Sequence, residues 1–234
     1  MRYLKLFKTE ADYIAYRDGG DYVLPNVCYA KDDNKVHYSE ILYSIKNYIV
    51  GDGKAYIKTD YYISNYDVME FYYAVPTGDY VLLGSKGTNF WVHLLQTQDA
   101  KAYMAWDMTS SAFQECKSAR NTILGMVIKN EVYRAVKWQD NGTEVTLKTY
   151  SGIPEERICD KPLCIFTRSL ADSDGVDERI SAAKIGEIII KDSRTGSVKL
   201  HLKPAVSFGV IGMVDEVSKK FYANANTEGS FKVE

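Results

Sequence analysis

The sequence lacks the short motifs of the common nucleotide-binding and nucleophilic enzymes. It contains no Walker loop, no GxGxxG and no GxSxG, and Gly84–Ser85 has none of the context of a nucleophile elbow. The three histidines lie in strand-like runs, and no cysteine or serine nucleophile pattern stands beside them. We therefore interpret His37, His93 and His201 as structural residues rather than as members of a catalytic triad.

Cysteine is scarce, and its spacing does not fit a zinc site. The four cysteines form no CxxC pair, and the interval between Cys159 and Cys164 is wrong for a zinc knuckle. Cysteine often serves simply as a small apolar residue. We therefore expect Cys28, Cys116, Cys159 and Cys164 to be buried free thiols.

Neither sign of charge is in excess. Lysine and arginine total 29, aspartate and glutamate total 31, and no basic block stands out, which argues against a nucleic-acid partner. No apolar run reaches the length of a transmembrane helix, and the opening MRYLKLFKTE lacks the apolar stretch of a signal peptide. We expect no membrane association, and synthesis in a cytoplasm without export.

The residues that are abundant favour β structure. Apolar residues make up 46% of the chain, which is enough for a core, and 19 tyrosines fit half-buried pleated surfaces. From Ala55 onward, alternating runs follow one another with turn signals between them and no helical period. Such spacing predicts a sandwich of antiparallel sheets. The main runs are AYIKTDYYI, YDVMEFYYAV, YVLLGS, FWVHLLQT, KAYMAWDM, TILGMVIKN and KPLCIFTRSL.

Three hairpins are expected in the second half of the chain. Asn141–Gly142 lies between alternating runs, a pair that favours a tight primed turn. A second hairpin turns near Thr195–Gly196 and a third near Glu216–Ser218. The clearest loop is residues 170–183, in which a short helix could form.

Residues 1–45 have a different pattern. YLKLF alternates like a strand, Thr9 followed by Asp12 starts a short helix that ends at Gly19–Gly20, and two extended runs follow. The sequence therefore predicts a small β-α-β arm over residues 1–45 and a sandwich over residues 46–234.

Four stretches of the sandwich resemble laminin G-like, concanavalin A-like lectin/glucanase domains. These domains are frequent in structural proteins of phages and prophages of gut bacteria. The matching stretches are GDGKAYIKTDYYIS, EVYRAVKWQDNGTEVTLKTY, KIGEIIIKDSRTGSVKLHLKPA and GVIGMVDEVSKKFYANANTEGSF. The resemblance spans residues 50–231 and implies an antiparallel jelly-roll sandwich that the closing stretch seals. In that stretch it implies close backbone approach or bulging at Gly209 and Gly212, and turn caps at Asp215 and Asn224. It also implies that Val210, Ile211, Met213 and Phe221 face the core or the opposite sheet.

The arm also resembles a known element. FKTEADYIAYRDGGDYVLPNVCYAKDDNKVHYS is similar to a leader on virion proteins of phages of gut bacteria, including crAss-like phages. The resemblance implies a non-enzymatic virion structural protein, a capsid decoration or a head or tail fibre component. It would dock on other virion proteins through residues 1–45 and form a homo-oligomer. The alternative is a glycan-binding adhesin on a phage appendage or a bacterial surface.

Two sets of residues are candidates for ligand binding. Trp91, Trp106 and Trp138 could stack on sugar rings as lectin aromatics do, although each lies in a strand-like run where tryptophan is usually buried. Asp172, Asp174 and Asp177 imitate the start of a calcium loop, but the final carboxylate of that pattern is missing, so a solvated loop is the competing interpretation. Calcium is therefore the one cofactor that the sequence suggests.

Glycoside hydrolysis is the weakest hypothesis. Glucanases with this fold place two acidic residues on one strand, and here the nearest pair, Asp67 and Glu70, falls on opposite faces of a strand.

Two pairs of adjacent tyrosines, Tyr61–Tyr62 and Tyr72–Tyr73, lie in strand-like runs. In a strand one ring of each pair must point outward, and these exposed rings could form a protein interface.

Overall fold

The computed structural model describes most of the chain as strands. The described residues are 3–7, 26–30, 35–38, 43–74, 78–88, 90–96, 102–106, 109–113, 120–129, 133–140, 143–207 and 209–234. Within these ranges every named element is a β-strand, and no helix there has the length and apolar character needed to cross a membrane. The two cysteines described with their side chains, Cys159 and Cys164, are free and buried, as expected.

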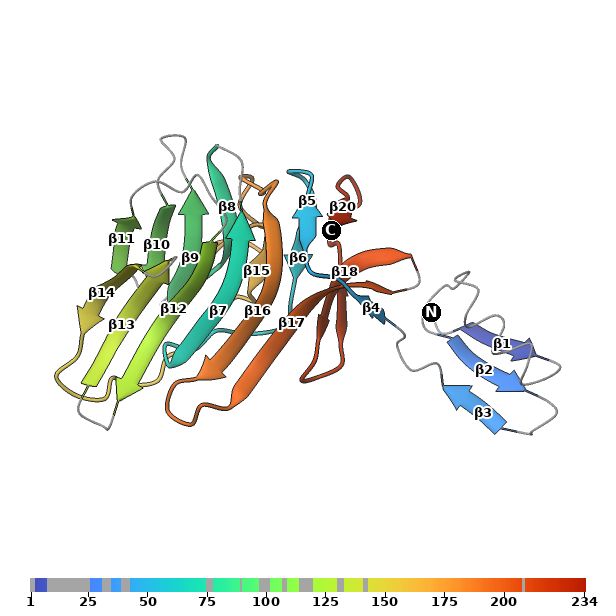
Figure 1. The fold of residues 1–234 in the computed structure, drawn as a ribbon, viewed down its shortest axis with the longest axis horizontal. Helices are drawn as coiled ribbons and strands as arrows, with labels where there is room; N and C mark the ends of the chain where they lie inside the picture. The colour runs from blue at the N-terminus through green and yellow to red at the C-terminus, as the bar shows by residue number, and fades with distance from the viewer. Residues whose placement is uncertain are drawn as a thin grey trace.

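Two antiparallel sheets form the body (Figure 1). The large sheet has the order β14-β13-β12-β7-β16-β17-β18-β19, and β4, β5 and β20 pair beside it. Its strands are β4 (Tyr43–Ile45), β5 (Ile49–Gly51), β7 (Asp67–Ala74), β12 (Arg120–Lys129), β13 (Tyr133–Asp140), β14 (Thr143–Thr149), β16 (Lys184–Asp192), β17 (Val198–Ser207), β18 (Val210–Asp215), β19 (Phe221–Ala223) and β20 (Phe231–Val233).

The small sheet covers one face of the large sheet and has the order β11-β10-β9-β8-β15-β6. Its strands are β6 (Ile57–Lys58), β8 (Tyr80–Lys86), β9 (Trp91–Gln96), β10 (Ala102–Trp106), β11 (Thr109–Phe113) and β15 (Cys164–Ile165). The predicted antiparallel jelly-roll sandwich is thus confirmed.

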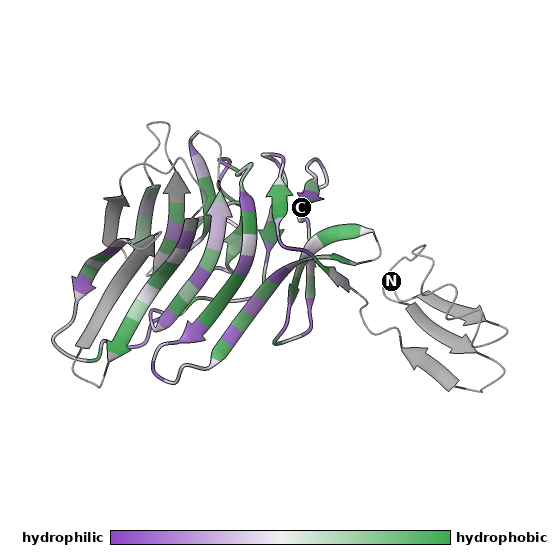
Figure 2. Ribbon diagram, viewed as in Figure 1, coloured by the Kyte–Doolittle hydropathy of each residue, from purple (hydrophilic) through white to green (hydrophobic). Residues whose placement is uncertain are grey.

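Alternation along the strands separates the core from the outer face of the large sheet. In β7, Met69 and Tyr73 are fully buried between the sheets, whereas Glu70 and Tyr72 lie on the opposite face. Figure 2 shows the same banding of apolar and polar residues along β7, β16 and β17. Because side chains in a strand point alternately to its two faces, the outer face of this sheet presents polar and aromatic residues in rows.

The three expected hairpins are confirmed. β13 pairs antiparallel with β14 across residues 141–142, and β16 pairs with β17 through a turn in which Gly196 has a φ of 74°. β18 pairs with β19. In contrast, AYIKTDYYI and KPLCIFTRSL contribute strands of only two residues each. Phe166 has a φ of 72°, and such a left-handed residue ends β15.

The closing stretch was predicted correctly at its turns and only partly at its core. Met213 is fully buried, and a Cβ on Gly212 would lie 2.3 Å from the Tyr222 carbonyl oxygen, so this close approach requires glycine. Asp215 Oδ1 and Oδ2 accept bonds from the amides of Val217 and Ser218. Val210 contradicts the expectation, because it is 46% exposed at the open end of β18.

The other predicted turn cap, Asn224, is confirmed, and it helps to close the sandwich. Its Oδ1 accepts from the Tyr56 amide, and its Nδ2 donates to the Gly229 carbonyl oxygen. The chain then ends in β20, which pairs with β5 from the start of the sandwich.

The N-terminal strands form a separate three-stranded sheet. β1 (Tyr3–Phe7) pairs in parallel with β2 (Asn26–Ala30), which pairs antiparallel with β3 (Lys35–Tyr38). A parallel pair needs a crossover connection, as in a β-α-β unit. The helix predicted between Thr9 and Gly20 lies outside the described residues. β4 pairs with β17, so residues 43–45 take part in the large sheet.

The short helix considered for residues 170–183 does not form. This segment consists of turns and isolated bridges. Asp177 Oδ1 accepts a bond from the Arg179 amide, and the Ser173 hydroxyl accepts one from the Gly175 amide. Such local side-chain bonds to the backbone compete with the hydrogen bonds of a helix.

Candidate functional site

A groove of about 300 Å³ lies on the outer face of the large sheet. It crosses β16, β7 and β12, which lie side by side (Figure 1). The described residues that line it are Glu70, Phe71, Tyr72, Asn121, Thr122, Ile123, Glu187 and Ile189. Strand register explains this set, because Glu70 lies opposite both Ile123 and Ile189, and Tyr72 lies opposite Asn121.

A β-bulge places Glu187 in the groove. The register between β16 and β7 shifts between Ile185 and Ile188, and both isoleucines are fully buried. Without the extra residue, Glu187 would share the inward face of Ile185, since the two are separated by one position. The bulge turns the Glu187 side chain outward instead, as bulges commonly do near binding sites.

The two groove carboxylates contact basic side chains that are not among its lining residues. Glu70 Oε1 is 2.8 Å from Lys191 Nζ. Glu187 Oε1 contacts His201 Nε2 and is 3.9 Å from Lys203 Nζ. For both glutamates the partner atom is Oε1, and among the described residues no hydrogen-bond donor is assigned to either Oε2. The groove therefore offers two carboxylate oxygens that can accept further bonds.

A pair of tyrosines extends one end of the groove. The ring centroids of Tyr72 and Tyr48 are 5.0 Å apart, and Lys184 Nζ lies 4.1 Å from the centroid of the Tyr48 ring. Gly186 leaves room for this packing, because a Cβ there would lie 3.3 Å from both Tyr48 and Tyr72. The result is an aromatic wall beside polar acceptors, a combination that suits the apolar faces and hydroxyl groups of a sugar.

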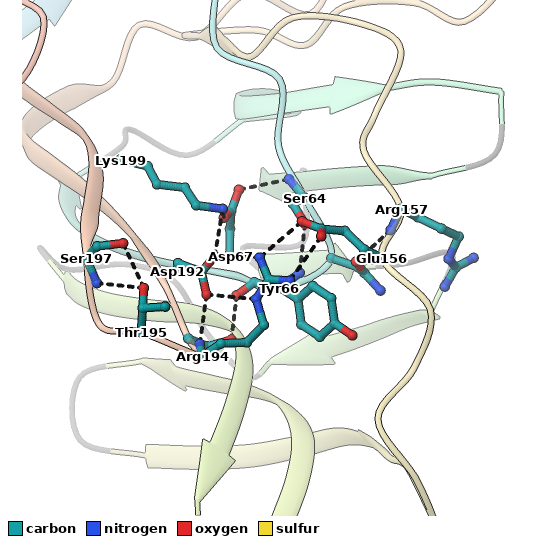
Figure 3. Close-up of polar contacts among 12 residues, drawn as sticks. Ser64, Tyr66, Asp67, Glu156, Arg157, Asp192, Arg194, Thr195, Ser197 and Lys199 are labelled. Carbon is teal, nitrogen blue, oxygen red and sulfur yellow. Dashed lines mark hydrogen bonds and ion pairs between the residues drawn. The ribbon is translucent and has the colours of Figure 1, made fainter. Parts of the chain in front are cut away.

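A second polar cluster is structural (Figure 3). Asp67 and Asp192 lie opposite each other on β7 and β16, and Lys199 Nζ is 3.0 Å from Asp67 Oδ1 and 3.1 Å from Asp192 Oδ2. Arg194 binds Asp192 and Glu156, and its guanidinium lies 4.2 Å from the centre of the Tyr66 ring. This cluster ties the β16–β17 hairpin to the loop around residue 156.

Burial and charge act in opposite directions within this cluster. Burial raises the pKa of Asp67 despite hydrogen bonds from the Ser64 amide, Tyr61 and Lys199, which lower it. The Arg194 guanidinium holds the pKa of Asp192 well below its usual range. We interpret Asp67 and Asp192 as buried charges that Lys199 and Arg194 compensate.

Two of the tryptophans predicted as sugar contacts, Trp91 and Trp106, are not among the described residues that line the groove. Trp106 is fully buried and packs edge-on against Phe90, with ring centroids 6.0 Å apart, so it cannot stack on a sugar. Trp91 is half-buried in β9 of the small sheet, where its ring stacks on His93 at 5.0 Å. Trp138 lies in β13 opposite Leu124, and its side chain is outside the described part of the structure.

His93, beside Trp91, has the structural role expected from the sequence. Burial, and then the neighbouring Arg168, lower its pKa to about 3. Its Nδ1 lies 3.0 Å from Arg168 Nη1. A Cβ on Gly84 would lie 2.8 Å from the His93 Cβ, so the two strands approach closely at this point.

The aspartates predicted for calcium do not converge. Asp177 is bound by Arg168 and Arg179, each with a nitrogen 2.9 Å from Oδ2. Asp174 is fully exposed and lies 3.4 Å from Lys161 Nζ, and Asp172 is exposed. Within the described ranges no group of three or more His, Cys, Asp or Glu could hold a metal ion.

Sequence reasoning missed Glu70, Asn121 and Glu187 as site residues, although it placed one tyrosine of the Tyr72–Tyr73 pair outward. Tyr73 is fully buried and Tyr72 lies on the outer face, which confirms that expectation. Glu70 and Tyr72 are two positions apart on one strand, and this spacing alone could have indicated a shared outer face. The contributions of β12 and β16 depend on strand order.

The fold and the groove define a jelly-roll sandwich with a polar, tyrosine-flanked groove on its large sheet. No family model and no curated protein matches the sequence. Among solved structures, the chain is similar to a protein from Bacteroides ovatus to which a carbohydrate-binding role is provisionally ascribed. The TM-score is 0.51 at 10% identity, over 81% of this chain and 60% of that one. The chain therefore spans less than two thirds of that structure, and the likeness concerns the fold.

Two further structures are more distant. A SAP-like pentraxin from Limulus polyphemus gives a TM-score of 0.43 at 8% identity, over 77% of this chain and 96% of that one. A scytalido-glutamic peptidase gives 0.36 at 10% identity, over 79% and 100%. At these scores neither adds to the assignment of the fold.

Proposed function

We propose that this chain is a non-enzymatic glycan-binding protein and that the groove on its large sheet is the binding site. The observation that carries the proposal is the convergence of Tyr72, Asn121, Glu70 and Glu187 in one open groove. An aromatic ring packs on the C–H face of a sugar, and carboxylate and amide groups bond its hydroxyls. The carbohydrate-binding role ascribed to the Bacteroides ovatus protein of similar fold supports the same proposal.

Binding without hydrolysis fits the two glutamates best. A glycosidase needs one carboxylic acid that stays protonated, usually because an apolar pocket surrounds it. Here the Glu70 side chain is 37% exposed and that of Glu187 is 47% exposed, and each contacts a basic side chain. Neither has the surroundings of a general acid.

Replacing Tyr72 with alanine tests the site. We expect about a tenfold loss of affinity for any glycan that binds the wild-type protein, because a stacking surface worth about 1.4 kcal/mol is removed. Binding would be screened on a glycan array and measured by calorimetry on the oligosaccharides that score.

The matched control is Tyr62→Ala, which removes an exposed tyrosine that does not line the groove. It should bind glycans like the wild type. Silence of the wild-type protein on the array would refute the proposal, and so would equal affinities of the Tyr72→Ala and wild-type proteins.

A second proposal concerns the N-terminal sheet. We propose that residues 1–41 are an adaptor that anchors the sandwich to other virion proteins, so that oligomeric copies display their grooves outward. Its support is the leader-like sequence together with the pairing of β1, β2 and β3 among themselves, apart from the two sandwich sheets in the described residues.

Deleting residues 1–41 should leave a sandwich that unfolds cooperatively near the wild-type temperature but no longer joins particles. The deletion stops before β4 because Tyr43–Ile45 pairs with β17. The measurements are thermal unfolding and mass spectrometry of purified particles. Incorporation of the shortened chain at the wild-type level would contradict the adaptor role.

A further inference from the structure

We propose that the groove selects neutral saccharides and discriminates against acidic ones. This inference rests on the proposed glycan-binding function and adds the chemical class of ligand. Among the eight described residues that line the groove, two are glutamates and none is lysine, arginine or histidine. An acidic sugar bound there would lie beside the carboxylates of Glu70 and Glu187, and no basic residue among the described lining residues could pair with it.

The arrangement of the counter-charges supports this selection. Lys191, His201 and Lys203 all approach their glutamates through Oε1, and none of the three lines the groove. The carboxylates, and not these three basic side chains, therefore line the groove. What remains accessible is acceptor capacity at Glu70 and Glu187, which suits hydrogen-bond donors without charge.

Sugar hydroxyls are donors of that kind. An ionised carboxylate can only accept hydrogen bonds, so each glutamate can satisfy one or two ligand hydroxyls. The carboxylate of a uronate or sialate in the same place could not donate a hydrogen bond to the glutamates. It would also be repelled by their like charge at short range and would lose its hydration. The asymmetry comes from the lining itself, since the net charge of the whole chain is only −2.

The test compares matched probes on the full-length protein. Neutral probes are gluco-, xylo-, manno- and galacto-oligosaccharides, and acidic probes are the same gluco-, manno- and galacto-oligosaccharides oxidised at C6 to uronates, with alginate and polygalacturonate. We expect at least a tenfold preference for a neutral oligosaccharide over its oxidised partner. The preference should shrink as salt rises from 20 mM to 500 mM, because screening shortens the range of the repulsion.

Variants test whether Glu70 and Glu187 cause the preference for neutral oligosaccharides. Glu70→Gln and Glu187→Gln keep the side-chain shape and remove the charge, and the double variant should reduce the neutral-to-acidic ratio at least threefold. Glu228→Gln makes the same change of charge at an exposed turn residue that does not line the groove, and it should leave the ratio unchanged. The salt series on the wild-type protein provides a readout that needs no substitution.

The outcomes are separable. If no probe binds, the proposed function fails. If acidic probes bind as tightly as neutral ones, or if the ratio in the double variant equals that of the wild type, the glycan-binding function stands and the selection for neutral saccharides is overturned.

Discussion

Replacing Lys199 with methionine is expected to lower the free energy of unfolding by about 3 kcal/mol, because removal of one partner leaves buried charges uncompensated. The Asp67 side chain has no exposed surface, and that of Asp192 is 6% exposed. In the variant, Asp67 would retain only neutral donors, the Tyr61 hydroxyl and the Ser64 amide. Urea unfolding at pH 7 measures the loss.

The pH dependence of this loss follows from Asp67. Burial already raises its pKa in the folded protein, so the folded state favours the protonated acid relative to the unfolded chain. Because the pKa of Asp67 is higher in the folded than in the unfolded chain, its ionisation lowers the free energy of unfolding above about pH 4, the pKa of an unfolded aspartate. This destabilisation disappears as the pH falls. The deficit of the Lys199→Met variant should therefore shrink between pH 7 and pH 4.

Two controls make the assignment specific. Lys191→Met removes a cation from an exposed pair with Glu70 and should cost less than about 1 kcal/mol. Asp67→Asn in the Lys199→Met background removes the charge that the lysine compensated and should restore part of the stability. An unchanged urea midpoint for Lys199→Met would show that the cluster contributes nothing.

The sandwich and its hairpins could be predicted because their signals are local. Asn141–Gly142 and Thr195–Gly196 mark turns within a few residues of the strands they join, and alternation fixes which residues of β7 face the core. The groove could not be predicted in the same way. Its walls come from β7, β12 and β16, which are adjacent only because of strand order, and strand order is set by long-range pairing.

Two local departures from alternation account for the other errors. The bulge at residues 186–187 moves Glu187 to the outer face, where a period of two would bury it. The left-handed conformation of Phe166 ends β15 after two residues, although KPLCIFTRSL has the composition of a longer strand. Phe166 is fully buried and packs against Phe231, a tertiary contact that the local composition does not reveal.

The same Phe166–Phe231 contact leads to a second large effect. Phe231→Ala should lower the free energy of unfolding by about 3 kcal/mol, the usual range for truncating a buried phenylalanine. The Phe231 ring is 7% exposed and its centroid lies 5.0 Å from that of Phe166. Chemical unfolding measures the loss, and Lys232→Ala, at the next and exposed position, should be close to neutral.

The functional consequence of Phe231→Ala distinguishes closure of the sandwich from a local cavity. The strand that Phe231 begins ends near Glu234, whose backbone exchanges hydrogen bonds with Tyr48 and whose side chain binds Lys184. Tyr48 packs against Tyr72 at the aromatic end of the groove, and Lys184 Nζ lies over the Tyr48 ring. If β20 closes the sandwich, Phe231→Ala should weaken glycan binding as well as stability. If Phe231→Ala keeps the wild-type free energy of unfolding, β20 does not close the sandwich. If the variant is less stable but binds glycans with unchanged affinity, β20 contributes to the core and not to the groove.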